Sequence, residues 1–73
     1  MTEFMKSFRH DGRVRRYTIR STPEGWNVRK EENDRVLQQS FYQDWHRVER
    51  VRRAFAIECS TLVENGWRED AGN

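Results

Sequence analysis

The chain is poor in the residues that cross-link, kink or loosen a small protein. It has one cysteine, one proline and four glycines in 73 residues. The single Cys59 cannot form a disulfide within the chain, and no stretch has the ~20 apolar residues of a membrane span or the apolar core of a signal peptide. These absences predict a reduced, cytoplasmic setting and no membrane partner.

Motifs for catalysis, metals and cofactors are missing as well. His10 and His46 have no cysteine, histidine or carboxylate at the spacing of a zinc site, and the glycines are too isolated to form a phosphate-binding loop. Cys59 lies within an apolar pattern, where a buried thiol is expected rather than a nucleophile. The sequence therefore predicts no enzyme activity, no metal, no cofactor and no small-molecule substrate.

Charge is what the chain has in abundance. Charged residues make up 36% of it, hydrophobic residues 34% and aromatic residues 12%, a composition that is polar but still typical of a folded domain. Twelve of the fourteen basic residues are arginine, which is suited to bidentate contact with phosphate or carboxylate. A chain of this length forms one domain with a small core. We predict that domain over residues 1–67 and a disordered tail over 68–73.

Three polar turns divide the first part of the chain, namely HDGR at 10–13, TPEG at 22–25 and ENDR at 32–35. The Asp-Gly pair of the first turn favours a type I′ hairpin, and proline followed by glycine two positions later favours a type I turn at the second. The runs between the turns are rich in aromatic and β-branched residues. They predict four strands, at roughly 3–9, 13–21, 25–32 and 35–42.

Counting pairs outward from each turn sorts the side chains of these strands onto two faces. In the third hairpin this counting pairs Trp26 with Phe41 and Lys30 with Leu37. One face then collects the large apolar side chains: Phe4, Phe8, Tyr17, Ile19, Trp26, Val28, Leu37 and Phe41.

After Tyr42 the hydrophobic period changes from two to 3.6, with Asp44 as the expected N-cap and Gly66 just past the expected end. An apolar stripe follows at helical spacing and is widened by Trp45, Ala56 and Val63: Val48, Val51, Phe55, Cys59 and Leu62. The predicted fold class is α+β, a four-stranded antiparallel meander with one C-terminal helix packed on one face (ββββα).

The second face of the predicted sheet is rich in arginine, amide and hydroxyl side chains. Such side chains contact the phosphates, sugars and base edges of nucleic acids. The candidate residues for binding single-stranded DNA or RNA are Arg9, Arg16, Arg20, Asn27, Arg29, Gln38 and Tyr42. Only Tyr42 offers a ring on which a base could stack. This face is either such a binding site, a contact with a second molecule or an ordinary polar surface.

The order strand, strand, strand, strand, helix resembles the unit of the single-stranded-DNA-binding coactivator and Whirly proteins. The resemblance covers nearly the whole chain as an element order and includes no shared motif. It implies paired units that bind nucleic acid across their strands. The stretches GWNV and DWHRVERVRRAF also look like stretches in short uncharacterised bacterial proteins, a likeness that implies no function.

A second interpretation is a protein-interaction or self-association module without nucleic acid. Ile57 would point away from the apolar stripe, beside Ala54 and Thr61, and these three residues would form the contact with a second copy or with another protein. The arginines at 47, 50 and 53 are interleaved with glutamates, which favours a solvated helix face.

Overall fold

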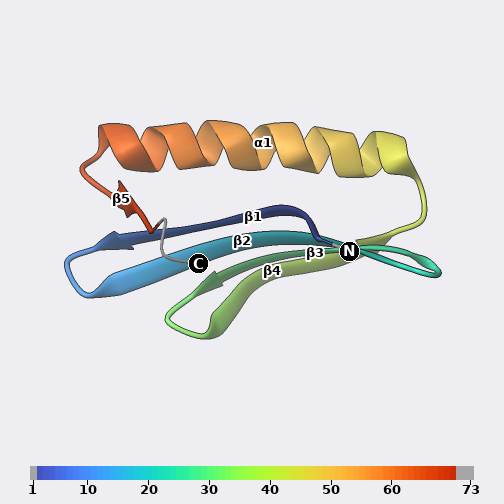
Figure 1. The fold of residues 1–73 in the computed structure, drawn as a ribbon, viewed down its shortest axis with the longest axis horizontal. Coiled ribbons are helices and arrows are strands. Elements are labelled where there is room, and N and C mark those ends of the chain that lie inside the picture. Colours follow the sequence, from blue (N-terminus) through green and yellow to red (C-terminus); the bar gives the residue numbers. More distant parts are fainter. Residues whose placement is uncertain (1, 71–73) are drawn as a thin grey trace.

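The computed structural model describes residues 2–70, and only the backbone of Thr2; it shows an antiparallel sheet with a helix along one face (Figure 1). The elements are β1 (Thr2–His10), β2 (Arg13–Thr22), β3 (Gly25–Glu32), β4 (Arg35–Tyr42), α1 (Trp45–Glu64) and β5 (Arg68–Glu69). Within the sheet the strand order is β4-β3-β2-β1-β5. The predicted α+β fold class and ββββα order are confirmed.

Two of the hairpin turns have a left-handed backbone at both central residues. Asp11 and Gly12 have φ of 48° and 77°, as expected for a type I′ turn, and Asn33 and Asp34 have φ of 51° and 66°. Asn33 also joins its turn to β2, because its backbone N–H donates to the Val14 carbonyl at 2.9 Å and its Oδ1 accepts from the Val14 N–H at 2.8 Å. The third turn is thus held by hydrogen bonds outside its own hairpin.

The pairing of β3 with β4 differs from the predicted register. The turn pairs Glu31 with Val36 as expected, but a β-bulge follows, so that Lys30 lies opposite Gln38 instead of Leu37. The extra residue moves every later side chain of β4 to the other face of the sheet. Trp26 consequently pairs with Tyr42 and not with Phe41.

The core lies between α1 and the strands. Its buried side chains are Phe8, Tyr17, Ile19, Val28, Val48, Phe55, Cys59, Leu62 and Trp67. Phe55 is central to it, with its ring 4.9 Å from that of Tyr17 and 6.1 Å from that of Phe4, centroid to centroid. The placement of Leu37 and Phe41 in the core is wrong, because the bulge leaves both about half exposed. The widening of the helix stripe is also wrong: Trp45, Ala56 and Val63 are exposed.

The helix ends in a Schellman motif that directs the chain back onto the sheet. Asp44 caps the N-terminus by accepting from the His46 N–H at 2.9 Å. At the other end Gly66 has φ of 94°, and the N–H groups of Gly66 and Trp67 donate to the carbonyls of Val63 and Leu62 at 3.1 and 2.9 Å. The buried side chain of Trp67 is thereby delivered to the core.

Part of the segment expected to be a disordered tail forms a strand. Arg68 and Glu69 of β5 pair with Arg9 and Phe8 of β1, and the N–H of Asp70 donates to the Ser7 carbonyl at 2.7 Å. The hydrophobic pattern of the predicted helix ends at Gly66, and the sequence after it contains no signal for a strand that pairs with β1. Residues 71–73 of the expected tail lie outside the described residues.

Asp34 is the position where the backbone is least suited to its residue, because a left-handed φ of 66° is costly for most L-residues and free for glycine. We expect Asp34→Gly to raise the free energy of unfolding by about 0.5 to 1 kcal/mol. Urea denaturation measures the change. Glu24→Gly is the control at an exposed turn position without positive φ, and it should lower stability. A loss of stability in Asp34→Gly would contradict the role assigned to the backbone.

Candidate nucleic-acid interface

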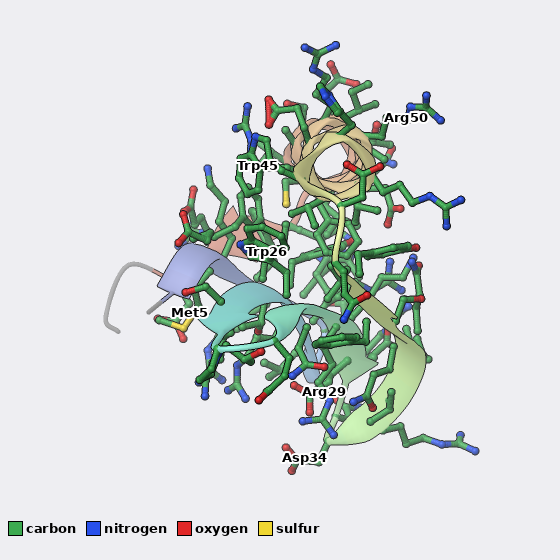
Figure 2. All side chains as sticks on the ribbon, turned by 90° about the vertical axis from the view of Figure 1, so that its right-hand side faces the viewer. Met5, Trp26, Arg29, Asp34, Trp45 and Arg50 are labelled. Atoms are coloured by element: carbon green, nitrogen blue, oxygen red, sulfur yellow. The ribbon has the colours of Figure 1, made fainter. Side chains whose placement is uncertain are left out.

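The side of the sheet away from α1, called the outer face below, is covered by no helix or strand of residues 2–70. Figure 2 shows Arg29 on this side, Trp26 between the sheet and α1, and Arg50 pointing away from the sheet. The strand registers place the outer-face side chains in three cross-strand rows: Ser7, Arg16, Glu31 and Val36; Met5, Thr18, Arg29 and Gln39; and Arg20, Asn27 and Phe41.

A surface hollow of about 850 Å³ lies over the middle of these rows, lined by residues that include Arg16, Thr18, Arg20, Asn27 and Arg29. Its floor contains Thr18, which is only 8% exposed although no element covers this face. Thr18 lies between Arg16 and Arg20 along β2 and opposite Arg29 on β3. The long arginine side chains therefore surround a sunken centre.

Several arginines elsewhere are held in ion pairs. Arg13 and Arg15 both donate to the carboxylate of Glu32, through their Nε atoms at 3.0 Å each. Their guanidinium carbons also lie 4.9 and 5.4 Å from the ring centroid of Trp67, within the range of cation–π attraction. Arg13 and Arg15 are therefore held in place by Glu32 and Trp67, and their contacts stabilise the fold.

Glu32 is the most perturbed acid of the molecule. Hydrogen bonds from Arg13 and Arg15 lower its pKa from 4.5 to about 2. On the helix, Arg52 donates from Nε and Nη2 to Glu49 at 2.8 Å each. Arg9, predicted as a nucleic-acid contact, lies on the outer face but is paired with Asp70 at 3.1 Å.

The three arginines of the hollow differ from these. Within residues 2–70, Arg16, Arg20 and Arg29 form no ion pair closer than 4.0 Å, and all three are exposed. Three acidic residues also line the hollow and offset part of this charge: Glu31, which lies opposite Arg16, and Glu69 and Asp70, which lie beside β1. The positive charge of the outer face is therefore concentrated around Arg20 and Arg29.

The bulge in β4 changes which residues join this surface. Gln38 and Tyr42, both predicted as nucleic-acid contacts, lie on the α1 side, where Gln38 is opposite Lys30 and Tyr42 packs against the core. Gln39 and Phe41 take their places on the outer face, in the rows of Arg29 and Asn27. Phe41 is 47% exposed, so the outer face has an aromatic ring that sequence reasoning had placed in the core.

A partly buried polar cluster lies on the α1 side of the sheet. Tyr17 is fully buried, and its hydroxyl donates to Glu58 Oε1 at 3.0 Å, while Lys30 Nζ donates to the same oxygen at 3.1 Å. Burial raises the pKa of Tyr17 to about 12 and that of Cys59 to about 11. Both groups keep their protons at neutral pH, so neither supplies a nucleophile there.

Among residues 2–70, no three histidine, cysteine, aspartate or glutamate side chains are grouped so that they could hold a metal ion. Nor does any helix in that range combine the length and apolar character that a membrane crossing requires.

Comparison with known proteins finds no matching family model, no matching curated protein and no matching solved structure. The resemblance to the single-stranded-DNA-binding coactivator and Whirly proteins therefore stands on the observed order of four antiparallel strands and a helix alone.

The Glu32 cluster predicts a defined pH dependence of stability. Because the folded-state pKa is depressed, the stabilisation is present above the ordinary value of 4.5 and is lost as pH falls toward about 2. Glu32→Gln should lower the free energy of unfolding at neutral pH by about 1 to 2 kcal/mol, allowing for partial solvent screening. Thermal unfolding of both proteins across this pH range measures the difference, which should shrink as the wild-type carboxylate is protonated.

Glu49→Gln is the matched control, since it also removes two arginine hydrogen bonds, but these join Glu49 to Arg52 three residues away in one helix and do not connect two strands. Its effect on unfolding should be much smaller. Equal effects of the two substitutions, or a Glu32→Gln difference that does not change with pH, would contradict the role given to Glu32.

Proposed function

We propose that the protein is a small non-enzymatic module that binds single-stranded nucleic acid across the outer face of its sheet. The observation that carries this proposal is the group of Arg16, Arg20 and Arg29, which surround a hollow on an uncovered face and have no acidic partner within 4.0 Å among residues 2–70.

The chemistry of the face suits a polynucleotide backbone with exposed bases. Arg20 and Arg29 lie on neighbouring strands in adjacent rows, roughly 7 to 8 Å apart at their diagonal positions, so both can contact phosphates of one strand. Asn27, between Arg20 and Phe41 in its row, offers both a donor and an acceptor to a base edge.

Phe41 favours a single strand over a duplex. A base stacks on an aromatic side chain only when it is unpaired and turned out of its own stack, and Phe41 is the exposed ring of the three outer-face rows. The resemblance in element order to the single-stranded-DNA-binding coactivator and Whirly proteins supports the same class of ligand. Nothing in these contacts distinguishes DNA from RNA, so both belong to the proposal.

The arginine contribution is tested by the double variant Arg20→Gln, Arg29→Gln. Each lost phosphate contact lowers the slope of log affinity against log salt by about 0.7 for a single strand, so we expect a decrease of roughly 1.4 together with weaker binding. Fluorescence anisotropy of a labelled oligothymidylate of about 15 nucleotides, followed over a salt series, measures both quantities.

The double variant Arg47→Gln, Arg50→Gln removes the same charge from the exposed surface of α1, where neither arginine has an ion pair within residues 2–70. It should change affinity and slope much less. Equal losses in the two double variants would mean unspecific attraction to a basic protein. Absence of wild-type binding at roughly 50 mM salt would refute the proposal.

Phe41→Ala tests base stacking separately from charge. Removal of a stacking ring should weaken binding of the same oligonucleotide by ~1 to 3 kcal/mol, with the salt slope unchanged because no phosphate contact is lost. Ile57→Ala, at the most exposed large apolar side chain of α1, is the control and should leave binding unaltered. A Phe41→Ala protein that binds as the wild type does would remove Phe41 from the interface.

A protein-interaction or self-association module is the second candidate function. The observation in its favour is Ile57, which is 69% exposed, with exposed Ala54 and Thr61 beside it on α1. A single exposed isoleucine is common on soluble proteins, and the flanking side chains are small. The helix strip therefore supports this function less strongly than the outer face supports nucleic-acid binding.

A further inference from the structure

The two edges of the sheet differ in how far another strand covers them. At one edge β5 covers the C-terminal part of β1 through the pairs Phe8–Glu69 and Arg9–Arg68, and this pairing is reinforced by the ion pair of Arg9 with Asp70 at 3.1 Å and by Lys6, whose Nζ lies 3.9 Å from Glu69. At the other edge β4 is the last strand in the order (Figure 1), and no strand of residues 2–70 pairs with its outer side. Within residues 2–70, β4 is therefore uncovered over its whole length, whereas the part of β1 that β5 leaves open contains the charged residues Glu3 and Lys6.

β4 has one of the features by which edge strands avoid pairing, the bulge at Leu37, but the rest of the strand lacks the others. Proteins protect such edges with lysine, proline or inward-pointing charge, but the residues from Val36 to Tyr42 contain neither proline nor charge. Instead they include Val36, Leu37 and Phe41, which are 45%, 50% and 47% exposed. The bulge interrupts the regular pairing of β4 with β3 at Leu37. The residues from 37 to 41 form an uncharged segment.

We propose that β4 pairs antiparallel with β4 of a second copy of the chain, about a two-fold axis at Gln39. In this register Leu37 lies opposite Phe41 of the partner subunit, twice by symmetry, and Gln39 lies opposite the partner's Gln39. Apolar side chains then meet apolar ones, and amides meet amides. The inference concerns the edge of the sheet and does not depend on nucleic-acid binding by its outer face.

Neighbouring registers are less favourable. An axis between Gln38 and Gln39 would oppose an α1-side residue to an outer-face residue, which antiparallel pairing does not allow. An axis at Ser40 would place Phe41 opposite Gln39, and an axis at Gln38 would place it opposite Arg35. The axis at Gln39 is the one that pairs Leu37 and Phe41 with each other, so that both exposed apolar residues of each copy have an apolar partner.

The pairing would join two sheets edge to edge, with both helices on one side and both outer faces on the other. This follows because a two-fold axis that relates antiparallel strands in one sheet is perpendicular to that sheet. A five-residue edge contact buries less surface than permanent dimers do, so we expect a weak dimer with a dissociation constant of roughly 1 to 100 µM.

Charge reversal at the axis tests both the interface and its register. Gln39→Lys and Gln39→Glu each place two like charges directly opposite one another, and each should raise the dimer dissociation constant about fivefold or more. An equimolar mixture of the two variants places lysine opposite glutamate and should return the dissociation constant to the wild-type value or below. Sedimentation velocity of the unmodified full chain and of the variants, without nucleic acid, measures this.

Leu37→Asp and Ile57→Asp separate the two exposed apolar surfaces. The first should dissociate the dimer, and the second, on the outer side of α1, should not. A monomeric wild type at roughly 0.2 mM, a dimer lost in Ile57→Asp but kept in Leu37→Asp, or a mixture of charge variants that stays monomeric would each overturn the proposal. The double variant Arg20→Gln, Arg29→Gln should still sediment as a dimer, as the wild type does. Loss of the dimer and loss of nucleic-acid binding are therefore told apart.

Discussion

The whole structure depends on one constraint, which is that a single 20-residue helix can cover only one face of the sheet. The residues beneath it are therefore almost wholly buried: Tyr17, Ile19 and Val28 are each 0% exposed, and Phe55 packs against Tyr17 from the helix. No helix or strand of residues 2–70 covers the opposite face, so its side chains must be compatible with water or with a ligand. Arginine side chains around the buried Thr18 are compatible with water and also with an anionic ligand.

Local chemistry was sufficient to predict most of this fold. The Asp-Gly turn has the left-handed backbone expected of it, Asp44 caps α1, and Gly66 ends it. The bulge in β4 was not predictable, because its residues have no positive φ and need no glycine to mark it. One extra residue exchanged Tyr42 for Phe41 on the outer face, so the arginine part of the candidate site was foreseen and the aromatic part was not.

Trp67 shows a second limit of local pattern. It follows the helix stop directly, and nothing near it in the chain indicates that it will be buried. Its partners are His10, Arg13 and Arg15, whose side chains lie within 5.5 Å of its ring, centroid to centroid or guanidinium carbon to centroid. These residues are more than fifty positions from Trp67 in the sequence, so they meet Trp67 only once the sheet has formed. The chain that follows Trp67 forms β5, which pairs with Phe8 and Arg9 at one end of the β1 edge.

We expect nucleic acid to contact the uncovered face of the sheet and not the helix. An NMR titration of the labelled protein with a short oligothymidylate tests it most directly, because each amide reports its own surroundings. We expect the largest changes in amide chemical shift at outer-face positions such as Thr18, Asn27 and Arg29. The amide signals of Arg50 and Ile57 on α1 should not change. Changes centred on α1, or spread evenly over both surfaces, would contradict it.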